Sequence, residues 1–299
     1  MSNSNSLIKK IARGISVSSA MTANTVFHGP PLLALGLSKL VKSSPKVDET
    51  NINIANRWIG VNNWLIEKVL PNTHWDIHID PALDLNMEGR YLMTCNHQSW
   101  VDTTVNQYFG LTRMPLTRFF TKWELIFIPF VGQAFKILGF PMMKRHTKEQ
   151  IAKNPELKTR DMEEARKSCE QLLSQPFTLL NYLEGTRITE EKHAKQQSPY
   201  QNLLKPKAGG LALALNILGD QIDALVDMTI VYPDGAPGYG EFWVGEVPRI
   251  IVDLRKIELP EWINTGDYED DAEYREKFQK WVDQLWQEKD ELITRLKNQ

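Results

Sequence analysis

The chain has 299 residues, of which 42% are hydrophobic and 24% are charged, and its formal net charge is -2. This composition is ordinary for a globular α/β protein, and the balanced charge gives no overall field that would favour nucleic acid. The two cysteines, Cys95 and Cys169, have no second Cys and no His at metal-ligand spacing. We therefore expect two small buried residues rather than a disulfide or a metal site.

The N-terminal segment predicts contact with a membrane surface. Over residues 7–17 the apolar side chains share one helical face and the basic ones lie away from it, which is typical of a short amphipathic helix at an anionic surface. A mildly apolar stretch follows over 26–41 and is interrupted by Pro30 and Pro31. No uncharged apolar run reaches about 20 residues, so a spanning helix is not expected, and no cleavage pattern indicates a secretory signal. The alternative is a helix pair packed on a soluble domain.

A plausible linker over 42–46 divides the chain into an N-terminal membrane-contacting segment, 1–45, and an α/β domain, 46–299. Residues 52–70 predict a helix with Ile54, Trp58, Val61, Leu65 and Val69 roughly on one stripe. Residues 75–79 alternate in polarity and predict a strand.

Residues 91–95 predict a short buried strand, and apolar residues spaced as in a helix follow from about Ser99. His97 then lies at a strand-to-helix turn, and Asp102 lies one turn into the helix. Five residues along a continuous helix turn through roughly 500°, so the two side chains meet only if the chain folds back over the first helical turn. Ser99 and Asp102 also fit a capping box, which is the purely structural interpretation.

Two segments after this turn leave alternatives open. The unusually apolar run over 125–131 suits either an acyl-chain groove or the core. It follows a strand-like stretch over 114–121, and a second short strand from residue 140 ends in a basic cluster that contains Arg145. That cluster is either a solvated strand end or a phosphate contact, because Arg forms forked bonds to phosphate.

A second polar turn is predicted after the strand over 177–183, which follows an amphipathic helix over 160–174 capped by Asp161. The strand delivers Glu184, Gly185, Thr186 and Arg187 to its carboxyl end, where open α/β sheets place ligands. A glycine there lets the backbone approach a ligand, and Arg supplies a planar cation. A simple turn with a surface ion pair is the alternative.

The rest of the chain completes the expected fold. We expect a loop over 188–206, a helix over 211–218, a strand over 225–231, an edge hairpin from 241–247 and 249–254, and a last helix over 270–296. That helix is either a lid or a cover for the sheet. The fold class is therefore α/β, with a central mixed, mostly parallel sheet flanked by helices, an N-terminal helical segment and a long C-terminal helix.

Four blocks over roughly residues 90–235 together resemble the glycerolipid acyltransferase family, which includes 1-acyl-glycerol-3-phosphate acyltransferases. His97 and Asp102 match its His-x4-Asp block, and the tetrapeptide from Glu184 to Arg187 matches its third block. Lys122, with Pro129, Gly132, Gly139 and Arg145, resembles the second block, and Val231-Tyr232-Pro233 resembles the fourth. The residues around the third block look closer to a branch with lysocardiolipin and lysophosphatidate acyltransferases, including bacterial inner-membrane members.

The resemblance implies transfer of an acyl group from acyl-CoA or acyl carrier protein to the hydroxyl of a lysophospholipid, with no metal and no further cofactor. It assigns His97 as the base and Asp102 as the residue that orients it. The acceptor phosphate is assigned to Arg187 and Lys122, with Arg145 and the weaker candidate Lys207. Glu184 is expected to hold a glycerol hydroxyl or to order the Arg187 loop.

The expected location is the cytoplasmic face of a bacterial inner membrane. The competing interpretations are a thioesterase-like hydrolase on the same fold and a non-enzymatic lipid-binding protein at a membrane surface. A nucleotide-binding protein is poorly supported, because the chain has neither a Gly-x-Gly-x-x-Gly turn nor a phosphate loop.

Overall fold

A computed structural model of the chain describes residues 2–39, 44–144, 148–154 and 156–299. Its centre is a six-stranded sheet in the order β1-β8-β7-β2-β6-β3. The strands are β1 (His74–Ile79), β2 (Arg90–Cys95), β3 (Thr117–Phe119), β6 (Phe177–Tyr182), β7 (Ala224–Val231) and β8 (Arg249–Ile257). Neighbouring strands are parallel except β7 and β8. A separate parallel pair joins β4 (Thr121–Lys122) to β5 (Met142–Met143).

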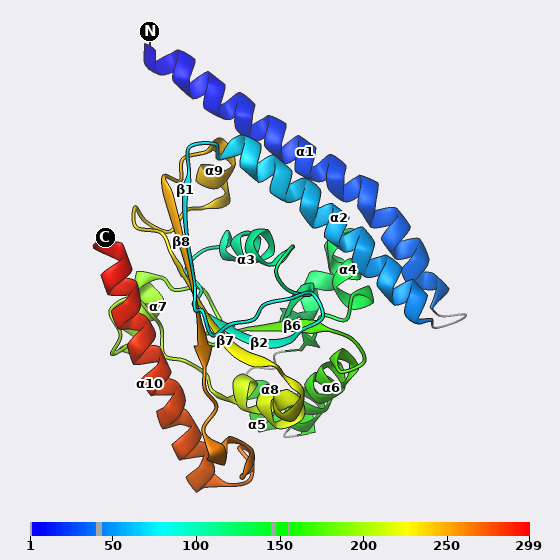
Figure 1. Ribbon diagram of the computed structural model, residues 1–299, viewed down its shortest axis with the longest axis vertical. Coiled ribbons are helices and arrows are strands. Elements are labelled where there is room, and N and C mark those ends of the chain that lie inside the picture. The colour runs from blue at the N-terminus through cyan, green and yellow to red at the C-terminus, as the bar shows by residue number, and fades with distance from the viewer. Residues whose placement is uncertain (1, 40–43, 145–147, 155) are drawn as a thin grey trace.

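Helices cover both faces of the sheet (Figure 1). On one face lie α1 (Ser2–Ser38), α2 (Pro45–Val69), α3 (Asp102–Gly110), α4 (Val131–Ile137) and α9 (Tyr239–Val244). On the other lie α5 (Lys148–Lys153), α6 (Glu156–Leu172), α8 (Gly209–Leu218) and α10 (Ala272–Lys297), and α7 (Glu190–Gln196) lies near α10. Three short 3-10 turns complete the described elements: η1 (Trp123–Phe127), η2 (Gly219–Gln221) and η3 (Glu261–Asn264). The predicted mixed sheet, flanking helices and long C-terminal helix are confirmed.

The core has one large layer on each face of the sheet. Phe177 and Leu179 of the sheet pack with α6, α8 and α10, where Phe278 and Trp286 are buried. The opposite layer packs sheet residues such as Met93 against α2, α3 and α9. Because α10 buries its apolar face in the first layer, it is a cover for the sheet, as one of the two sequence interpretations proposed.

Helix α1 is one continuous helix rather than a short helix followed by an interrupted stretch, so that expectation was wrong. Pro30 and Pro31 lie inside it, although a proline removes a helical N–H. Packing against α2 compensates: Leu32 is fully buried, and the Asn24 side chain donates to the Trp58 carbonyl oxygen at 3.0 Å. The two helices lie side by side along the upper right of Figure 1. The linker predicted over 42–46 falls mainly outside the described residues, and the domain boundary stays a prediction.

The predicted apolar stripe of α2 was largely wrong, because Val69 is its one buried member. The helix starts earlier, at Pro45, and buries Ala55, Ile59, Asn63 and Ile66, while Val61 is exposed. Asn51 and Asn63 also lie on the buried face, and these polar residues interrupt its apolar pattern in the sequence. The Asn63 side chain reaches the Tyr108 carbonyl oxygen at 3.4 Å, and such a bond makes burial of the amide tolerable.

Three local predictions after residue 150 were also wrong. The edge hairpin does not form, because residues 239–244 make α9 and β8 pairs directly with β7 and β1. The predicted loop over 188–206 contains α7, whose N-cap Thr189 accepts a bond from the Lys192 N–H at 3.2 Å. Helix α6 begins at Glu156, so Asp161 lies inside it rather than at its cap.

Candidate active site

His97 and Asp102 meet at the carboxyl end of β2. Nδ1 of His97 lies 2.8 Å from Oδ2 of Asp102. The chain folds back over the start of α3 as the five-residue spacing required, so this geometric expectation is confirmed. The His97 side chain is 15% exposed and that of Asp102 is fully buried. An ionised carboxylate only accepts hydrogen bonds, so it fixes the Nδ1–H tautomer and leaves Nε2 as the ring acceptor.

The buried carboxylate of Asp102 accepts bonds from three further donors. The backbone N–H groups of Gln98 and Ser99 donate to Oδ2 at 2.7 and 2.8 Å. The hydroxyl of Tyr232 donates to Oδ1 at 2.7 Å. These bonds replace the water that the carboxylate loses on burial. Asp102 therefore satisfies free N–H groups at the helix start, as the structural interpretation proposed, and also holds the imidazole.

Two tyrosines complete the surroundings of the pair. The ring of Tyr182, at the end of β6, stacks on His97 with centroids 4.2 Å apart. Its hydroxyl oxygen accepts a bond from the Asn106 side chain at 3.1 Å. Burial raises the pKa of Tyr182 well above its usual value, and burial followed by the charge of Asp102 does the same for Tyr232. Both hydroxyls therefore stay protonated at neutral pH, and the Tyr232 hydroxyl remains a donor to Asp102.

Glu184 ties the two turns together. One carboxyl oxygen, Oε1, accepts from the His97 N–H at 2.7 Å, and the other accepts from the Leu204 N–H at 2.9 Å. The side chain is fully buried, and this burial raises its pKa to about 8 against the opposing effect of the two backbone bonds. Glu184 therefore joins the His97 turn to the segment at Leu204, and its expected contact with a glycerol hydroxyl or with the Arg187 loop stays a prediction.

The turn after β6 places a cation beside the pair. Gly185 has a φ of +67°, a left-handed conformation that favours glycine. The hydroxyl of Thr186 and the carbonyl oxygen of Arg187 accept from Nζ of Lys192 at 2.8 and 2.9 Å, which braces the turn. The Arg187 guanidinium lies 4.0 Å from the ring centroid of Trp100, three residues after His97. Stacking on this ring leaves the edges of the guanidinium for hydrogen bonds.

The other predicted cations are placed differently. Nζ of Lys207 would lie 3.2 Å from a Cβ on Gly185, so this lysine borders the same turn. Lys122 is exposed on β4, and none of the recorded bonds and ion pairs among described residues joins it to His97. Arg145 lies outside the described residues.

The apolar run over 125–131 is not core, because Phe127 and Ile128 are 77% and 43% exposed. Val131 and Phe140 line a cavity of about 180 Å³ between α1, α2, α3 and α4, which also includes Gln107 of α3. The expectation of an acyl-chain groove stays a prediction.

Sequence reasoning missed several residues of this site. It assigned no role to Asn96, whose buried side chain donates to the Ile230 carbonyl oxygen and accepts from the Ile230 N–H, at 2.8 and 2.9 Å, linking β2 to β7. Tyr182 and Trp100 were also missed. Tyr232 carried a signal, since it precedes Pro233 in the fourth block, but its contact with Asp102 spans 130 residues.

Comparisons with known proteins show similarity to acyltransferases. A family model described as "Acyltransferase" matches residues 76–233. The chain is 25% identical over 254 residues to the 2-acyl-1-lysophosphatidylinositol acyltransferase of Saccharomyces cerevisiae, covering 70% of this chain and 62% of that protein. It is also 25% identical over 181 residues to the mouse 1-acyl-sn-glycerol-3-phosphate acyltransferase delta, covering 56% of this chain and 42% of that protein. It thus spans less than two thirds of the length of these relatives.

One solved structure shares the fold over nearly the whole chain. The 1-acyl-sn-glycerophosphate acyltransferase PlsC of Thermotoga maritima matches with a TM-score of 0.55 and 15% identity, covering 96% of this chain and 97% of that one. The resemblance carried by the four sequence blocks is confirmed at the level of the family, while the bacterial branch stays a prediction. Since the family model matches more than half of the chain, the protein belongs to the acyltransferase family.

Proposed function

We propose that the protein transfers a fatty acyl group from an acyl thioester, acyl-CoA or acyl carrier protein, to the free hydroxyl of a lysophospholipid such as 1-acyl-glycerol-3-phosphate. The observation that carries the proposal is the 2.8 Å contact between His97 and Asp102 beside the cationic turn of Arg187. The relatives named above are lysophospholipid and 1-acyl-glycerol-3-phosphate acyltransferases, which supports the choice of acceptor.

The chemistry follows from the free nitrogen of the imidazole. An alcohol is a poor nucleophile until its proton is removed, and Nε2 of His97 takes that proton as the oxygen attacks the thioester carbonyl. Asp102 stabilises the imidazolium that forms, as the carboxylate does in a hydrolase triad. Collapse of the tetrahedral intermediate forms the ester, breaks the carbon–sulfur bond and releases the thiolate. The imidazolium returns the proton to that thiolate.

The acceptor phosphate is assigned to the cations at the same sheet edge. Arg187 is held against Trp100, which orients its planar fork towards one direction of approach. Lys207 borders the same turn at Gly185. Lys122 and Arg145 remain proposed phosphate contacts on the strength of the family resemblance alone.

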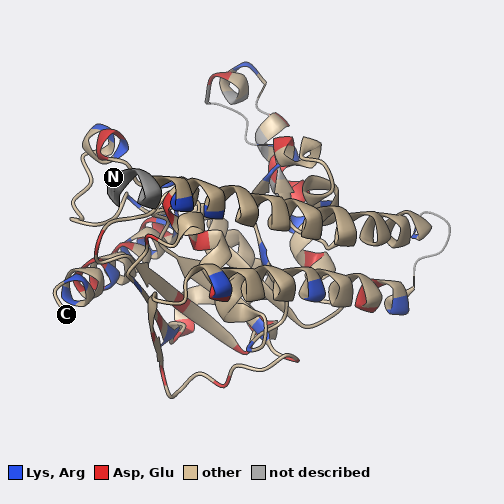
Figure 2. Ribbon diagram, turned by 90° about the horizontal axis from the view of Figure 1, so that it is seen from above, with Lys and Arg blue, Asp and Glu red and all other residues tan. Residues whose placement is uncertain are grey.

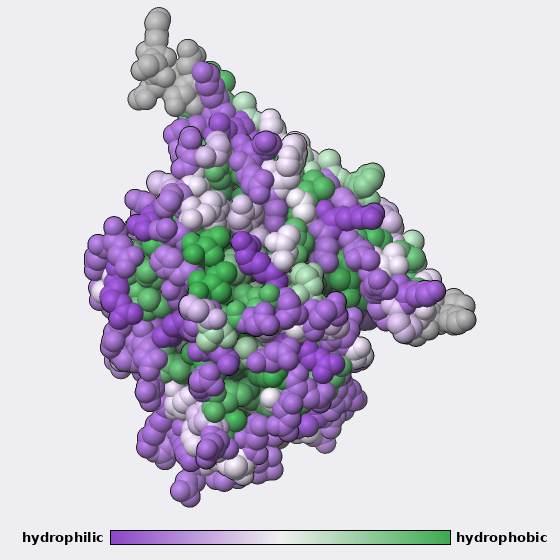
Figure 3. Space-filling view, viewed as in Figure 1, coloured by the Kyte–Doolittle hydropathy of each residue, from purple (hydrophilic) through white to green (hydrophobic). Residues whose placement is uncertain are grey.

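Membrane contact is proposed through α1. Its residues 14–38 contain no Asp, Glu, Lys or Arg, and Figure 2 shows that charged positions are sparse along it. Leu7, Ile8, Ile11 and Ile15 are all more than half exposed. Figure 3 shows apolar residues along the edge where Figure 1 places α1. None of the described helices is long and apolar enough to cross a bilayer. We propose that α1 lies on the cytoplasmic face of a bacterial inner membrane.

A hydrolase on the same fold is the second candidate, because water can replace the lipid hydroxyl. The stacked Arg187 argues against it, since water needs no phosphate clamp. The test supplies labelled palmitoyl-CoA and oleoyl-CoA to the full chain, with and without a panel of lysophospholipids, and identifies the products. Labelled diacyl phospholipid that forms only with the acceptor supports the proposal. Free fatty acid released at the same rate without acceptor overturns it, and no consumption of any acyl donor favours a lipid-binding protein.

A further inference from the structure

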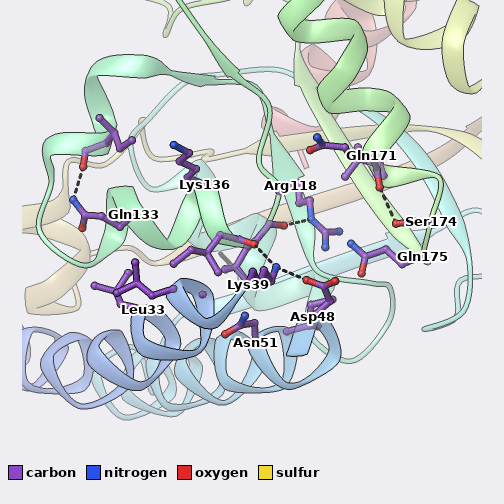
Figure 4. A pocket seen from close by; sticks show the side chains of 18 residues that line it. Leu33, Lys39, Asp48, Asn51, Arg118, Gln133, Lys136, Gln171, Ser174 and Gln175 are labelled. Carbon is purple, nitrogen blue, oxygen red and sulfur yellow. Dashed lines mark hydrogen bonds and ion pairs between the residues drawn. The ribbon is translucent and has the colours of Figure 1, made fainter. Parts of the chain in front are cut away.

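A large cavity lies apart from the catalytic pair, between the two N-terminal helices and the wall formed by α4 and the end of α6. Its volume is about 930 Å³. The lining includes Leu33 and Leu37 of α1, Ile52 of α2, Ile137 of α4 and Leu172 of α6. Neither His97 and Asp102 nor any residue of the Glu184–Arg187 turn lines it. Figure 4 shows this space with its polar side chains converging from several elements.

Arg118 of β3 is the unusual member of this lining. Its side chain is 1% exposed, and Nε donates to the Leu138 carbonyl oxygen at 2.7 Å. Its Nη1 has no hydrogen-bond partner among the described residues. Burial lowers the pKa of Arg118 to about 10, so the group remains a cation at neutral pH. An unpaired N–H on a buried cation is costly, which points to a partner that completes the site.

Asn51 of α2 gives a second, independent sign of a ligand. It is also 1% exposed, and both its amide nitrogen and its amide oxygen have no hydrogen-bond partner within the described part of the chain. It lines the same cavity as Arg118. A donor and a guanidinium therefore face one space from two different elements, as Figure 4 shows.

The charge of the described lining is positive. Lys39, Arg118 and Lys136 are cations, and Asp48 is the carboxylate in the set. Lys39 forms an ion pair with Asp48, and the charge of Asp48 also acts on Arg118. With one carboxylate against three cations, the lining keeps an excess of positive charge. An excess of positive charge favours an oxyanion, and guanidinium pairs well with phosphate or carboxylate.

The size and the apolar walls of the cavity indicate which group is attached to the anionic headgroup of the ligand. A cavity of about 930 Å³ is far larger than an inorganic anion needs, and falls in the range of lipid-sized or drug-sized ligands. Its apolar walls include side chains of α1, the helix proposed to contact the membrane. We propose that the cavity binds a single-chain lipid whose phosphate or carboxylate headgroup is held by Nη1 of Arg118 and the Asn51 amide. Lipid binding in this cavity does not depend on catalysis by His97.

Binding of labelled palmitate, 1-palmitoyl-glycerol-3-phosphate and inorganic phosphate to the full chain tests the proposal. The measurements use an Arg187→Ala background, which weakens lipid binding at the separate acceptor site. Lipid binding that remains then reports on the cavity alone, whether or not the proposed acyl transfer takes place. Arg118→Met should raise the Kd of the bound lipid about tenfold or more, the effect of one charge-assisted hydrogen bond. Arg118→Lys should recover part of this loss, because it restores the charge without the fork.

Arg166→Met is the matched control, because Arg166 is exposed on α6 outside the cavity, and it should leave the Kd unchanged. Ile52→Trp fills the cavity without altering a charge and should also weaken binding, which keeps the test valid if Arg118→Met fails to fold. The two lipid arms separate carboxylate from phosphate headgroups. Unchanged binding of both lipids in Arg118→Met and Ile52→Trp overturns the site. Inorganic phosphate that binds as tightly as the lipids overturns the lipid assignment.

Discussion

The Tyr232 hydroxyl donates to Oδ1 of Asp102 at 2.7 Å, and the same carboxylate holds His97 through its other oxygen. The residue that orients the imidazole is therefore itself held from two sides, by the start of α3 and by the end of β7. This arrangement keeps a buried carboxylate in one orientation, and through it the hydroxyl of Tyr232 helps to position the imidazole of His97.

Tyr232→Phe should lower kcat about tenfold and change the acceptor KM little. The substitution removes one hydrogen bond to a charged group, worth about 1.5–3 kcal/mol, while Asp102 keeps its three other donors. Steady-state acyl-transfer kinetics measure both constants. Tyr200→Phe is the matched control, since its hydroxyl bonds the distant Asp283 carbonyl oxygen. Equal kcat values for Tyr232→Phe and the control would show that this bond does not orient the base.

Removal of the Arg187 side chain should weaken acceptor binding more than turnover. Arg187→Ala takes away the guanidinium stacked on Trp100, so we expect the acceptor KM to rise about tenfold or more with a smaller change in kcat. Arg187→Lys keeps the charge but loses the planar fork, and its KM should fall between the two. Arg295→Ala, at an exposed position near the end of α10, serves as control. An unchanged acceptor KM in Arg187→Ala would remove the phosphate role.

Glu184 should make stability depend on pH. Burial raises its pKa in the folded chain from 4.5 to about 8, so between these values the folded state keeps a proton that the unfolded chain has lost. Its contribution to stability is therefore complete below about pH 4.5 and is lost as the pH rises through about 8. The slope is about 1.4 kcal/mol per pH unit within this window.

Urea unfolding from pH 5 to 9 measures this effect against Glu184→Gln. The amide cannot accept from both the His97 and Leu204 N–H groups, so the variant should be less stable than the wild type at pH 5. Since it has no proton to release, its stability should fall less steeply than that of the wild type. If the free energy of unfolding fell equally steeply with pH in the two proteins, Glu184 would not be the group that causes the pH dependence.

Gly185→Ala should destabilise the fold by about 1 kcal/mol or more, because φ of +67° is unfavourable for a residue with a Cβ. The new Cβ would also lie 3.2 Å from Nζ of Lys207. Thermal or denaturant unfolding gives the difference. Gly240→Ala is the matched control, because a Cβ there meets no atom within 4 Å. A loss no greater in Gly185→Ala than in Gly240→Ala would contradict the strained turn.

The sequence predicted the parts of the site that depend on local pattern. The strands that end at Cys95 and Tyr182 are short apolar runs followed by polar residues, and parallel pairing brings Cys95 opposite Tyr182. His97 and Glu184 then reach one edge of the sheet. The pattern was less informative where tertiary packing decides. Prolines at 30 and 31 suggested a break in a helix that α2 stabilises, and residues 241–247 suggested a strand where α9 forms over Tyr239–Val244.

Contacts between distant segments could not be predicted from the sequence either. The bonds from Tyr232 to Asp102 and from Asn96 to Ile230 span 130 and 134 residues. No spacing rule within a helix or strand predicts such pairs. The stacking of Tyr182 on His97 likewise depends on the register between β2 and β6, which the sequence does not specify.

The central claim is that His97 removes the acceptor proton with Asp102 as its support. Its most direct measurement is acyl transfer from palmitoyl-CoA to a lysophospholipid by His97→Ala and Asp102→Ala, each first shown by thermal unfolding to be folded. Both variants should lose about two or more orders of magnitude in kcat. A folded His97→Ala variant that transfers the acyl group at nearly the wild-type rate would contradict the account.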